Sequence, residues 1–465
     1  MSHADSQSLA AADKAHCWHP FTPIADWEAG EALVIERGEG VYLFDIQGRR
    51  YFDGTSSLWC AALGHRHPGL DAALSAQISQ LAHSTFLGMT HPAAIRLAQR
   101  LASKAPAGLR RVFYSDNGAT AVEIALKMAF QYHRQKERPE PGRTRFLAIE
   151  NAYHGDTLGD VSVGGVDRFH AMFRPLLFET VRAPSPYCYR CPLKLQFPGC
   201  GLACLDEAKK LIDTHADTLV AVVAEPVVQG AAGMIAQPPG WLGGLARHCR
   251  ELGVLLILDE VAVGFGRTGT LFACEQEGVS PDFLCMAKGL TGGYLPLAAT
   301  LTTDAIYSAF RGDAVDPKTF YHGHTFTGNP LGASVALAVL DAFEQDGVLE
   351  NVVRQSRRVA ERLQAALAPR RFVGEIRQRG LMCGIELVKD QLSREPLDYR
   401  LKAAWQVVQE ARRRGLLVRP LGDTVTFLPP LVSNDEEIDA MLDILIHSYE
   451  HVEQELTRTL ASGAE

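Results

Sequence analysis

The segment 254–258, VLLIL, constrains the fold more than any other part of the chain, because it is an unbroken apolar run of strand length. Such a run is typical of a strand that is buried on both faces. It ends in Asp259-Glu260, two acids at the point where the strand leaves the core. A lysine, Lys288, follows 29 residues after Asp259 (288 − 259), between an alanine and a glycine. Burial lowers the pKa of a lysine, so this pattern predicts an imine-forming amine beside a buried acid.

Other interpretations of this stretch have to be weighed. A lone lysine is ordinarily a surface residue, and an acid pair can cap a helix or form salt bridges. Gly264, Gly266 and Gly269 also spell GxGxxG after a strand, which is the fingerprint of a dinucleotide site. However, Asp259 and Glu260 separate the strand from these glycines, and no long amphipathic helix opens at Gly269. The sequence therefore favours the two anchors of a pyridoxal phosphate enzyme, a lysine for the carbonyl and an acid for the ring nitrogen.

The composition sets the class of protein. The 465 residues, 47% hydrophobic and 22% charged, allow two or three domains with a large core. A net charge of −8 and the lack of any basic cluster longer than Arg412–Arg414 argue against a nucleic-acid partner. No run of 18 apolar residues predicts a membrane span, and no secretory signal pattern is visible at the N-terminus. We therefore expect a cytoplasmic protein with small-molecule substrates and neither nucleic-acid nor membrane partners.

The order of patterns along the chain predicts a large α/β unit. Residues 1–15 are polar and alanine-rich, and we expect them to be poorly ordered. Residues 32–54 alternate apolar and polar side chains with glycines at turns, which predicts antiparallel hairpins. From residue 66, strands alternate with helices, which predicts a mostly parallel sheet with ligands beyond its strand ends. The expected strands are 111–115, 145–149, 219–225, 254–259 and 295–303, with a helix at 119–133 after the first.

The pattern changes after a long helix at 331–345. Helices and paired strands follow, which predicts a smaller α+β domain. The expected helices are 351–367, 401–414 and 435–457, and the expected strands lie at 373–388 and 416–431. We therefore divide the chain into an N-terminal segment, 1–65, that packs with the small domain, a cofactor-binding large domain, 66–330, and the C-terminal small domain, 331–465.

Several blocks of the sequence resemble those of class III aminotransferases, in matching order and spacing. The first four are AEPVVQG (224–230), LDEVAVGFGRTG (258–269), AKGLTGGYLPLA (287–298) and HGHTFTGNPLG (322–332). Further blocks resemble the branch that converts 8-amino-7-oxononanoate to 7,8-diaminononanoate in biotin synthesis. These are HCWHPFT (16–22), FDGTSSLWCAALGH (52–65), HSTFLGMTH (83–91), YSDNGATAVEIALKMAFQYH (114–133) and YHGDTLGDVSVGG (153–165). The resemblance covers about residues 16–449 and implies fold type I of the pyridoxal phosphate enzymes, with an obligate homodimer whose sites lie at the interface.

The resemblance also implies which residues bind the cofactor. Taken alone, the turn at 117–120 is a routine strand-to-helix connection, but the resemblance makes it the phosphate cradle. A second phosphate contact comes from the partner subunit, and two side chains flank the ring. Asp259 pairs with the ring nitrogen, and Lys288 is the catalytic residue that holds the cofactor and moves the proton. The implied cofactor-binding residues are Gly118, Ala119, Tyr153, Asp259, Val261, Lys288, His324 and Thr325.

Substrate recognition is implied in the same way. Arg419 matches a clamp for the carboxylate at the far end of the acceptor, and Trp59 matches a pocket tryptophan. Phe21 and Leu58 stand where members that use S-adenosylmethionine as amino donor carry Tyr and Trp, and these two departures resemble the branch that takes its amino group from lysine. We expect S-adenosylmethionine as the donor, with lysine as the alternative, or else another class III ω-aminotransferase activity. The implied substrate-binding residues are Phe21, Leu58, Trp59, Tyr153, Lys288, Gly323 and Arg419.

Four of the ten cysteines form a C-x2-C-x8-C-x3-C pattern, Cys188, Cys191, Cys200 and Cys204. The spacing is passable for a structural zinc site. Similar loops occur in relatives of this family that are not regarded as zinc enzymes. We therefore expect free thiols and no metal.

Overall fold

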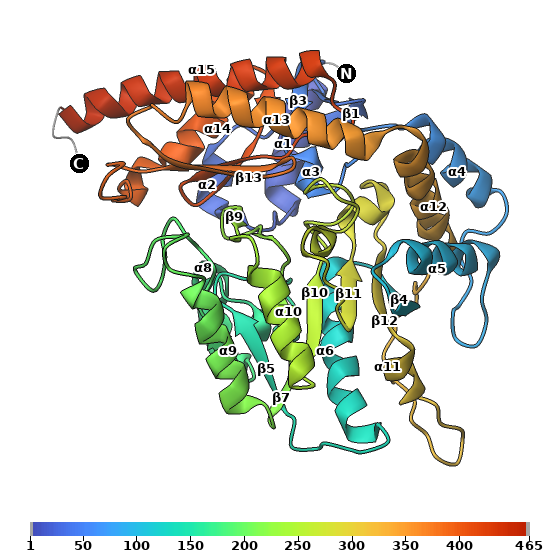
Figure 1. Cartoon of the computed structure of the whole chain (residues 1–465). Coiled ribbons are helices and arrows are strands. Elements are labelled where there is room, and N and C mark those ends of the chain that lie inside the picture. The colour runs from blue at the N-terminus through green and yellow to red at the C-terminus, as the bar shows by residue number, and fades with distance from the viewer. Residues whose placement is uncertain (1–2, 462–465) are drawn as a thin grey trace.

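A seven-stranded sheet forms the centre of the computed structural model, which describes residues 3–461 (Figure 1). The strand order is β4-β12-β11-β10-β7-β5-β6, and β12 alone among these seven runs antiparallel to its neighbours. This arrangement confirms the predicted, mostly parallel sheet of fold type I. The strands are β4 (Leu109–Ser115), β5 (Arg145–Ile149), β6 (Thr180–Ala183), β7 (Leu219–Ala224), β10 (Leu255–Asp259), β11 (Phe283–Met286) and β12 (Ala298–Thr303).

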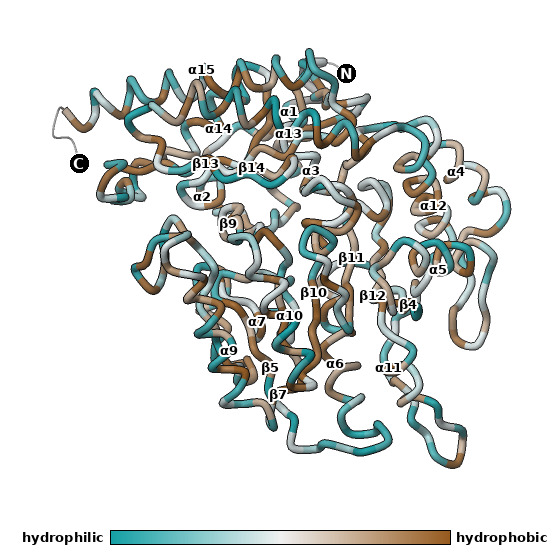
Figure 2. The backbone as a smooth tube through the Cα atoms, viewed as in Figure 1, coloured by the Kyte–Doolittle hydropathy of each residue, from teal (hydrophilic) through white to brown (hydrophobic). Residues whose placement is uncertain are grey.

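The apolar runs of the central strands follow from helices on both faces of the sheet. Successive side chains of a strand point to opposite faces. Leu255 and Ile257 of β10 pack in the same cluster as the buried face of α6 (Gly118–Gln135). Leu256 and Leu258 pack in the cluster that holds α9 (Ala203–His215) and α10 (Trp241–Glu251). Figure 2 shows the resulting hydrophobic colouring along β10 at the centre of the molecule.

The C-terminal part of the chain builds a second sheet, with order β13-β14-β17-β16 and antiparallel pairing throughout. Helices α13, α14 and α15 lie along it at the top of Figure 1. The elements are α13 (Val348–Ala366), β13 (Val373–Arg379), β14 (Met382–Leu387), α14 (Ala403–Arg413), β16 (Arg419–Leu421), β17 (Thr424–Phe427) and α15 (Asp435–Ala461).

The N-terminal residues form the predicted hairpins, β1 (Ile35–Glu39), β2 (Tyr42–Asp45) and β3 (Arg50–Asp53). A strand from the other end of the chain, β15 (Leu416–Leu417), adds to them by pairing in parallel with β3. The paired strands expected within residues 416–431 are present as β16 and β17, which pair with each other, and β15 is an additional short strand that pairs with β3. The three-part division at residues 65 and 330 stays a prediction.

The expectation of poor order over residues 1–15 was wrong for residues 3–15, which lie in helix α1 (His3–His16); residues 1 and 2 lie outside the described part. Tertiary contacts hold the end of this helix. Lys14 Nζ donates to the carbonyl oxygens of Glu28 and Gly30, both at 2.7 Å. The Asp13 carboxylate accepts from Trp27 Nε1 at 3.1 Å. These partners lie on and just after α2 (Ile24–Ala29), so the helix depends on residues that follow it in the chain, outside residues 1–15.

None of the helices within residues 3–461 is both long and apolar enough to cross a membrane. The remaining helices and strands connect the units described above. These connecting elements are α3 (Ser56–Trp59), α4 (Pro68–Ile78), α5 (Pro92–Lys104), α7 (Leu158–Val163), α8 (Asp167–His170), η1 (Ala171–Leu176), β8 (Val228–Gln229), β9 (Ile235–Ala236), η2 (Ala273–Glu277), η3 (Lys288–Thr291), α11 (Asp304–Ser308), α12 (Pro330–Gln345) and η4 (Tyr399–Leu401).

Candidate active site

The carboxyl ends of three neighbouring strands bring the candidate site together. Asp259 is the last residue of β10 and lies opposite Cys285 of β11. Lys288 follows two residues after β11 ends, and Glu225 follows directly after β7. Because parallel strands end at the same edge of the sheet, these three side chains gather there.

Lys288 is half-buried and adopts a left-handed backbone conformation, with φ of 45°, at the start of η3. Burial lowers the pKa of its amine, and the nearby carboxylates Asp259 and Glu225 only partly oppose this effect. The amine nitrogen lies 4.8 Å from the centre of the Trp59 ring. A larger share of the uncharged, nucleophilic amine is therefore present at neutral pH than for an exposed lysine.

The Asp259 carboxylate is buried and fixed by two hydrogen bonds. Its Oδ1 accepts from the backbone N–H of Val261 at 3.0 Å, and its Oδ2 lies 2.8 Å from Nδ1 of His154. His154 is itself buried, and its Nε2 has no hydrogen-bond partner within residues 3–461. Sequence reasoning missed His154, although its position directly after Tyr153 in the 153–165 block was an available signal.

Glu225 is a second residue that sequence reasoning missed. Its Oε1 accepts from the N–H of Gly230 at 2.9 Å, and its Oε2 accepts from the N–H of Tyr153 at 3.1 Å. Burial raises the pKa of this carboxyl to about 7. Glu225 thus ties the segment after β5, which carries Tyr153, to the segment after β7.

The amino terminus of α6 offers unpaired backbone donors. Asn117 caps the helix, since its side chain accepts from the N–H of Thr120 at 3.0 Å. The N–H groups of Gly118 and Ala119 have no hydrogen-bond partner within the part of the chain that the structure describes. A Cβ atom on Gly118 would lie 2.5 Å from a methyl group of Val261, so only glycine allows this close approach. Free amides at a helix start are a ready site for an anion such as phosphate.

Aromatic side chains form one wall of the site. The Phe21 ring meets that of Phe169 edge-on with centres 5.4 Å apart, and Phe169 meets Tyr153 at 6.0 Å. His170 stacks on Tyr153 at 6.1 Å with an interplanar angle of 11°. Phe169 and His170 belong to α8 and were not identified from the sequence, because nothing local in 167–170 distinguishes them from a surface turn.

Arg419, the first residue of β16, is half-buried, and burial lowers the pKa of its guanidinium. No carboxylate within residues 3–461 forms an ion pair with it. The titratable group that acts on it most is Tyr153, which connects Arg419 with the aromatic wall. An unpaired and partly desolvated guanidinium is suited to binding a carboxylate from solution.

The other expected residues lie as follows. Trp59 is buried, its Nε1 has no hydrogen-bond partner in the described chain, and Leu58 beside it is half exposed. His324 lies next to the α6 amino terminus, with Nδ1 3.0 Å from Asp116 Oδ2. Gly323 and Thr325 are exposed. The contacts of His324 and Thr325 with a second subunit, and of Gly323 with the substrate, stay predictions.

Two other sequence patterns have clear structural contexts. After Gly269 the chain enters the short 3-10 helix η2, so no long helix follows the GxGxxG pattern as a dinucleotide site requires. The four cysteines of the 188–204 loop are free thiols that line one small cavity, and burial raises the pKa of Cys204 to about 11. Within residues 3–461 no group of three or more side chains has the arrangement of a metal site.

The sheet and the pair of a lysine and an aspartate at adjacent strand ends define a pyridoxal phosphate-dependent transferase of fold type I. A family profile described as aminotransferase class-III matches residues 24–448. The chain belongs to the class III aminotransferase family, and it is an aminotransferase that uses pyridoxal phosphate.

Relatives within the family include biotin-pathway enzymes by name. The chain is 53% identical over 437 residues to a protein of Nitratidesulfovibrio vulgaris named adenosylmethionine-8-amino-7-oxononanoate aminotransferase, which covers 93% of this chain and 80% of the relative. The crystal structure of the enzyme with that name from Methanocaldococcus jannaschii is similar with a TM-score of 0.91 and 43% identity, over 96% of this chain and 99% of that one. An (S)-enantioselective omega-transaminase from Thermomicrobium roseum is similar with a TM-score of 0.90 and 35% identity, over 96% and 98%.

Proposed function

We propose that this chain transfers an amino group from S-adenosylmethionine to the ketone of 8-amino-7-oxononanoate, giving 7,8-diaminononanoate in biotin synthesis. The observation that carries the proposal is the unpaired Arg419, because Tyr153 lies within electrostatic reach of both Arg419 and Asp259. An acceptor whose ketone reacts at Lys288 while its carboxylate binds Arg419 is a keto acid with a carbon chain between these two groups. The relatives that share most of the chain are named for such a substrate.

The residues present fit pyridoxal phosphate. The free N–H groups of Gly118 and Ala119 suit its phosphate, and the buried Asp259 suits its ring nitrogen. When bound, the cofactor supplies the electron sink and carries the amino group between donor and acceptor. Asp259 would favour the protonated form of the ring nitrogen through its negative charge, and His154 and the Val261 amide hold the carboxylate in one orientation.

Lys288 performs the proton transfers. Its amine would hold the cofactor through the cofactor's carbonyl carbon. Its Nζ, whose pKa burial lowers, would act as the general base that takes the proton from the carbon bearing the amino group and as the acid that returns it. Tyr153 and Val261 would pack against the two faces of the cofactor ring.

The substrate pocket combines one cation with apolar walls. Arg419 binds the far carboxylate of the acceptor, and Trp59 and Tyr153 line the path from the carboxylate to the amine of Lys288. Phe21 and Leu58 border the amino donor, and the backbone of Gly323 contacts the substrate.

We also propose a homodimer in which His324 and Thr325 complete the phosphate site of the partner subunit. Large apolar side chains are exposed on the segment that carries His324 and Thr325, among them Tyr321 and Phe326. Leu87, in the segment 83–91, is exposed as well. A surface of this kind marks a protein interface. The proposed location is the cytoplasm, where ten free cysteines would stay reduced.

The test is a coupled assay with 8-amino-7-oxononanoate as sole acceptor and one amino donor at a time. Turnover with S-adenosylmethionine supports the proposal. Turnover with lysine alone would support the lysine branch, which Phe21 and Leu58 favour. Rejection of this acceptor together with turnover of simple amines would support an ω-aminotransferase, an activity that the likeness to the Thermomicrobium roseum enzyme favours.

A further inference from the structure

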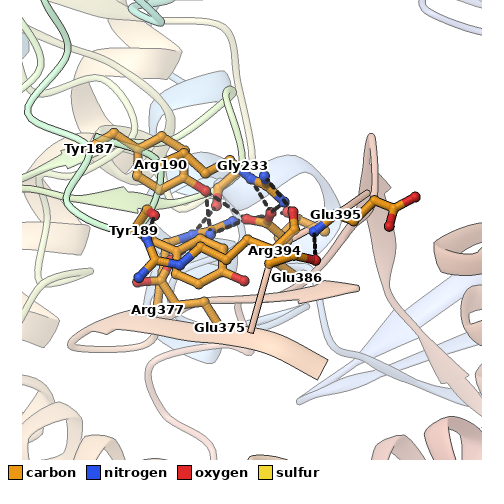
Figure 3. Close-up of polar contacts among 11 residues, drawn as sticks. Tyr187, Tyr189, Arg190, Gly233, Glu375, Arg377, Glu386, Arg394 and Glu395 are labelled. Carbon is orange, nitrogen blue, oxygen red and sulfur yellow. Dashed lines mark hydrogen bonds and ion pairs between the residues drawn. The ribbon is translucent and has the colours of Figure 1, made fainter. Parts of the chain in front are cut away.

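A cluster of buried charges joins the segment before α9 to the C-terminal sheet (Figure 3). Glu386 of β14 is at its centre. It accepts from the hydroxyl of Tyr187 at 2.6 Å and from Nε of Arg190 at 2.7 Å, and it also pairs with Arg377 of β13. Burial opposes the charge on Glu386, but these partners more than offset it and lower the pKa of the carboxyl. The cluster is therefore charged at neutral pH.

Arg377 reaches beyond this cluster in two directions. Its Nε donates to the carbonyl oxygen of Gly233 at 2.9 Å, and its Nη2 donates to Oγ1 of Thr424 at 3.0 Å. Gly233 lies in the turn between β8 and β9, and Thr424 begins β17. Arg377 itself is almost fully buried, so both contacts are protected from water.

Each of these two contacts leads into the candidate site. On one side, the N–H of Gly233 donates to the carbonyl of Gly230 at 3.1 Å, and Gly230 packs so closely on Trp59 that an added Cβ would lie 3.3 Å from its ring. Trp59 in turn lies beneath the amine of Lys288.

On the other side, β17 pairs with β16, which begins at Arg419. The hydroxyl of Thr426 donates to the carbonyl of Arg419 at 2.9 Å, and the same two residues are opposite each other in the strand register. Arg377 thus connects the wall beside Lys288 with the strand that carries Arg419.

We propose that Arg377 is a positioning residue that sets the distance between Arg419 and the amine of Lys288, and so selects acceptors by the number of carbons between ketone and carboxylate. The inference rests on the proposed function. A buried ion-pair cluster is suited to this role, because its directional bonds fix a geometry even where they add little net stability.

The test compares Arg377→Lys and the milder Thr424→Val with wild type. Thr424→Val removes a single contact of Arg377 and keeps the shape of the buried side chain. The acceptors are 8-amino-7-oxononanoate, its homologues with one methylene fewer or more, and 2-aminooctan-3-one, which lacks the carboxylate. We expect a KM for the native acceptor that rises roughly tenfold, as for a lost charge-assisted contact, with kcat unchanged. Discrimination against the homologues, roughly tenfold or more for wild type, should fall. The values for 2-aminooctan-3-one should not change.

Arg362→Lys is the control, because Arg362 also forms ion pairs, with Asp439 and Asp443, but these are partly exposed and join α13 to α15. It should change the thermal midpoint alone. In the Arg419→Ala background, Arg377→Lys should have no further effect, since the group through which it acts is absent.

Three results would overturn the positioning role of Arg377. The first is that the losses caused by Arg377→Lys and Arg419→Ala add in the double variant. The others are an equal loss of activity with 2-aminooctan-3-one and an unchanged discrimination between acceptors of different length. Failure of the proposed function is distinguishable, because wild type would then reject 8-amino-7-oxononanoate itself. In that case the same length series with the keto acids that wild type accepts decides the role of Arg377.

Discussion

Truncation of Arg419 to alanine should weaken recognition of the acceptor carboxylate and leave the fold intact. In the structure the guanidinium is half-buried, burial lowers its pKa, and no carboxylate of the described chain pairs with it. A hydrogen bond to a charged group contributes about 1.5–3 kcal/mol. At about 1.4 kcal/mol for each factor of ten, Arg419→Ala should lower kcat/KM for 8-amino-7-oxononanoate roughly 12- to 140-fold. Arg419→Lys keeps the charge but loses the two-pronged geometry, so we expect an intermediate loss.

The assay measures kcat/KM for this acceptor and for 2-aminooctan-3-one in parallel, together with the thermal midpoint. The carboxylate-free ketone should react equally well with both proteins. The midpoint should stay constant or rise slightly, because the truncation removes a cation that is partly desolvated without a partner. The backbone contact of residue 419 with Thr426 does not depend on the side chain and is retained. Equal loss with both ketones, or a midpoint several degrees lower, would show that Arg419 supports the structure and not the substrate.

Further experiments address the other assignments. Lys288→Ala should abolish turnover while thermal unfolding stays that of wild type, because its role is chemical; a variant that still cycles at a substantial rate contradicts the assignment. Asp259→Asn should retain the cofactor but slow both half-reactions in stopped-flow measurements, since a neutral amide does not favour the protonated ring nitrogen, and unchanged rates would exclude this role. For the 188–204 loop, elemental analysis should find less than one zinc per chain, and stoichiometric zinc would disprove the free-thiol interpretation. Burial raises the pKa of Asp160 from 3.8 to about 9, so the folded state keeps this proton to higher pH than the unfolded state. The stability that this group contributes is present below about pH 4 and is lost as the pH rises towards 9. Thermal unfolding of Asp160→Asn between about pH 5 and 9 should decline less steeply than that of wild type, and parallel profiles would contradict the shifted pKa.

The sequence predicted the central sheet well because its signal is strong and local. A strand covered by helices on both faces has to be apolar at every position, and β7 and β10 have this composition. The position of Asp259 followed from the same run, because an acid directly after a buried strand lies at the sheet edge where ligands bind. Lys288 could be placed beside it because its neighbours are small and apolar, which is unusual for a surface lysine.

Contacts between distant segments could not be predicted in this way. His154 and Asp259 are 105 residues apart in the chain, and only the packing of β5 and β10 around β7 brings them together. Helix α1 has the same explanation, because the carbonyls that bind Lys14 belong to Glu28 and Gly30. A sequence pattern reports the burial of a segment, but it does not report its partner.

The difference between local sequence patterns and contacts of distant segments matters most for the choice of amino donor. Read from the sequence, Phe21 and Leu58 remove an indole and a hydroxyl from the donor wall, which favours the aliphatic chain of lysine. The structure adds Phe169, whose ring meets Phe21 at 5.4 Å and Tyr153 at 6.0 Å, both edge-on. A sulfonium and an adenine are bound by aromatic faces, whichever residue supplies them. Since α8 supplies an aromatic ring that the motifs around positions 21 and 58 do not include, the replacements at these positions do not by themselves select lysine, and we propose that the rings of Phe21, Phe169 and Tyr153 form the wall that binds S-adenosylmethionine.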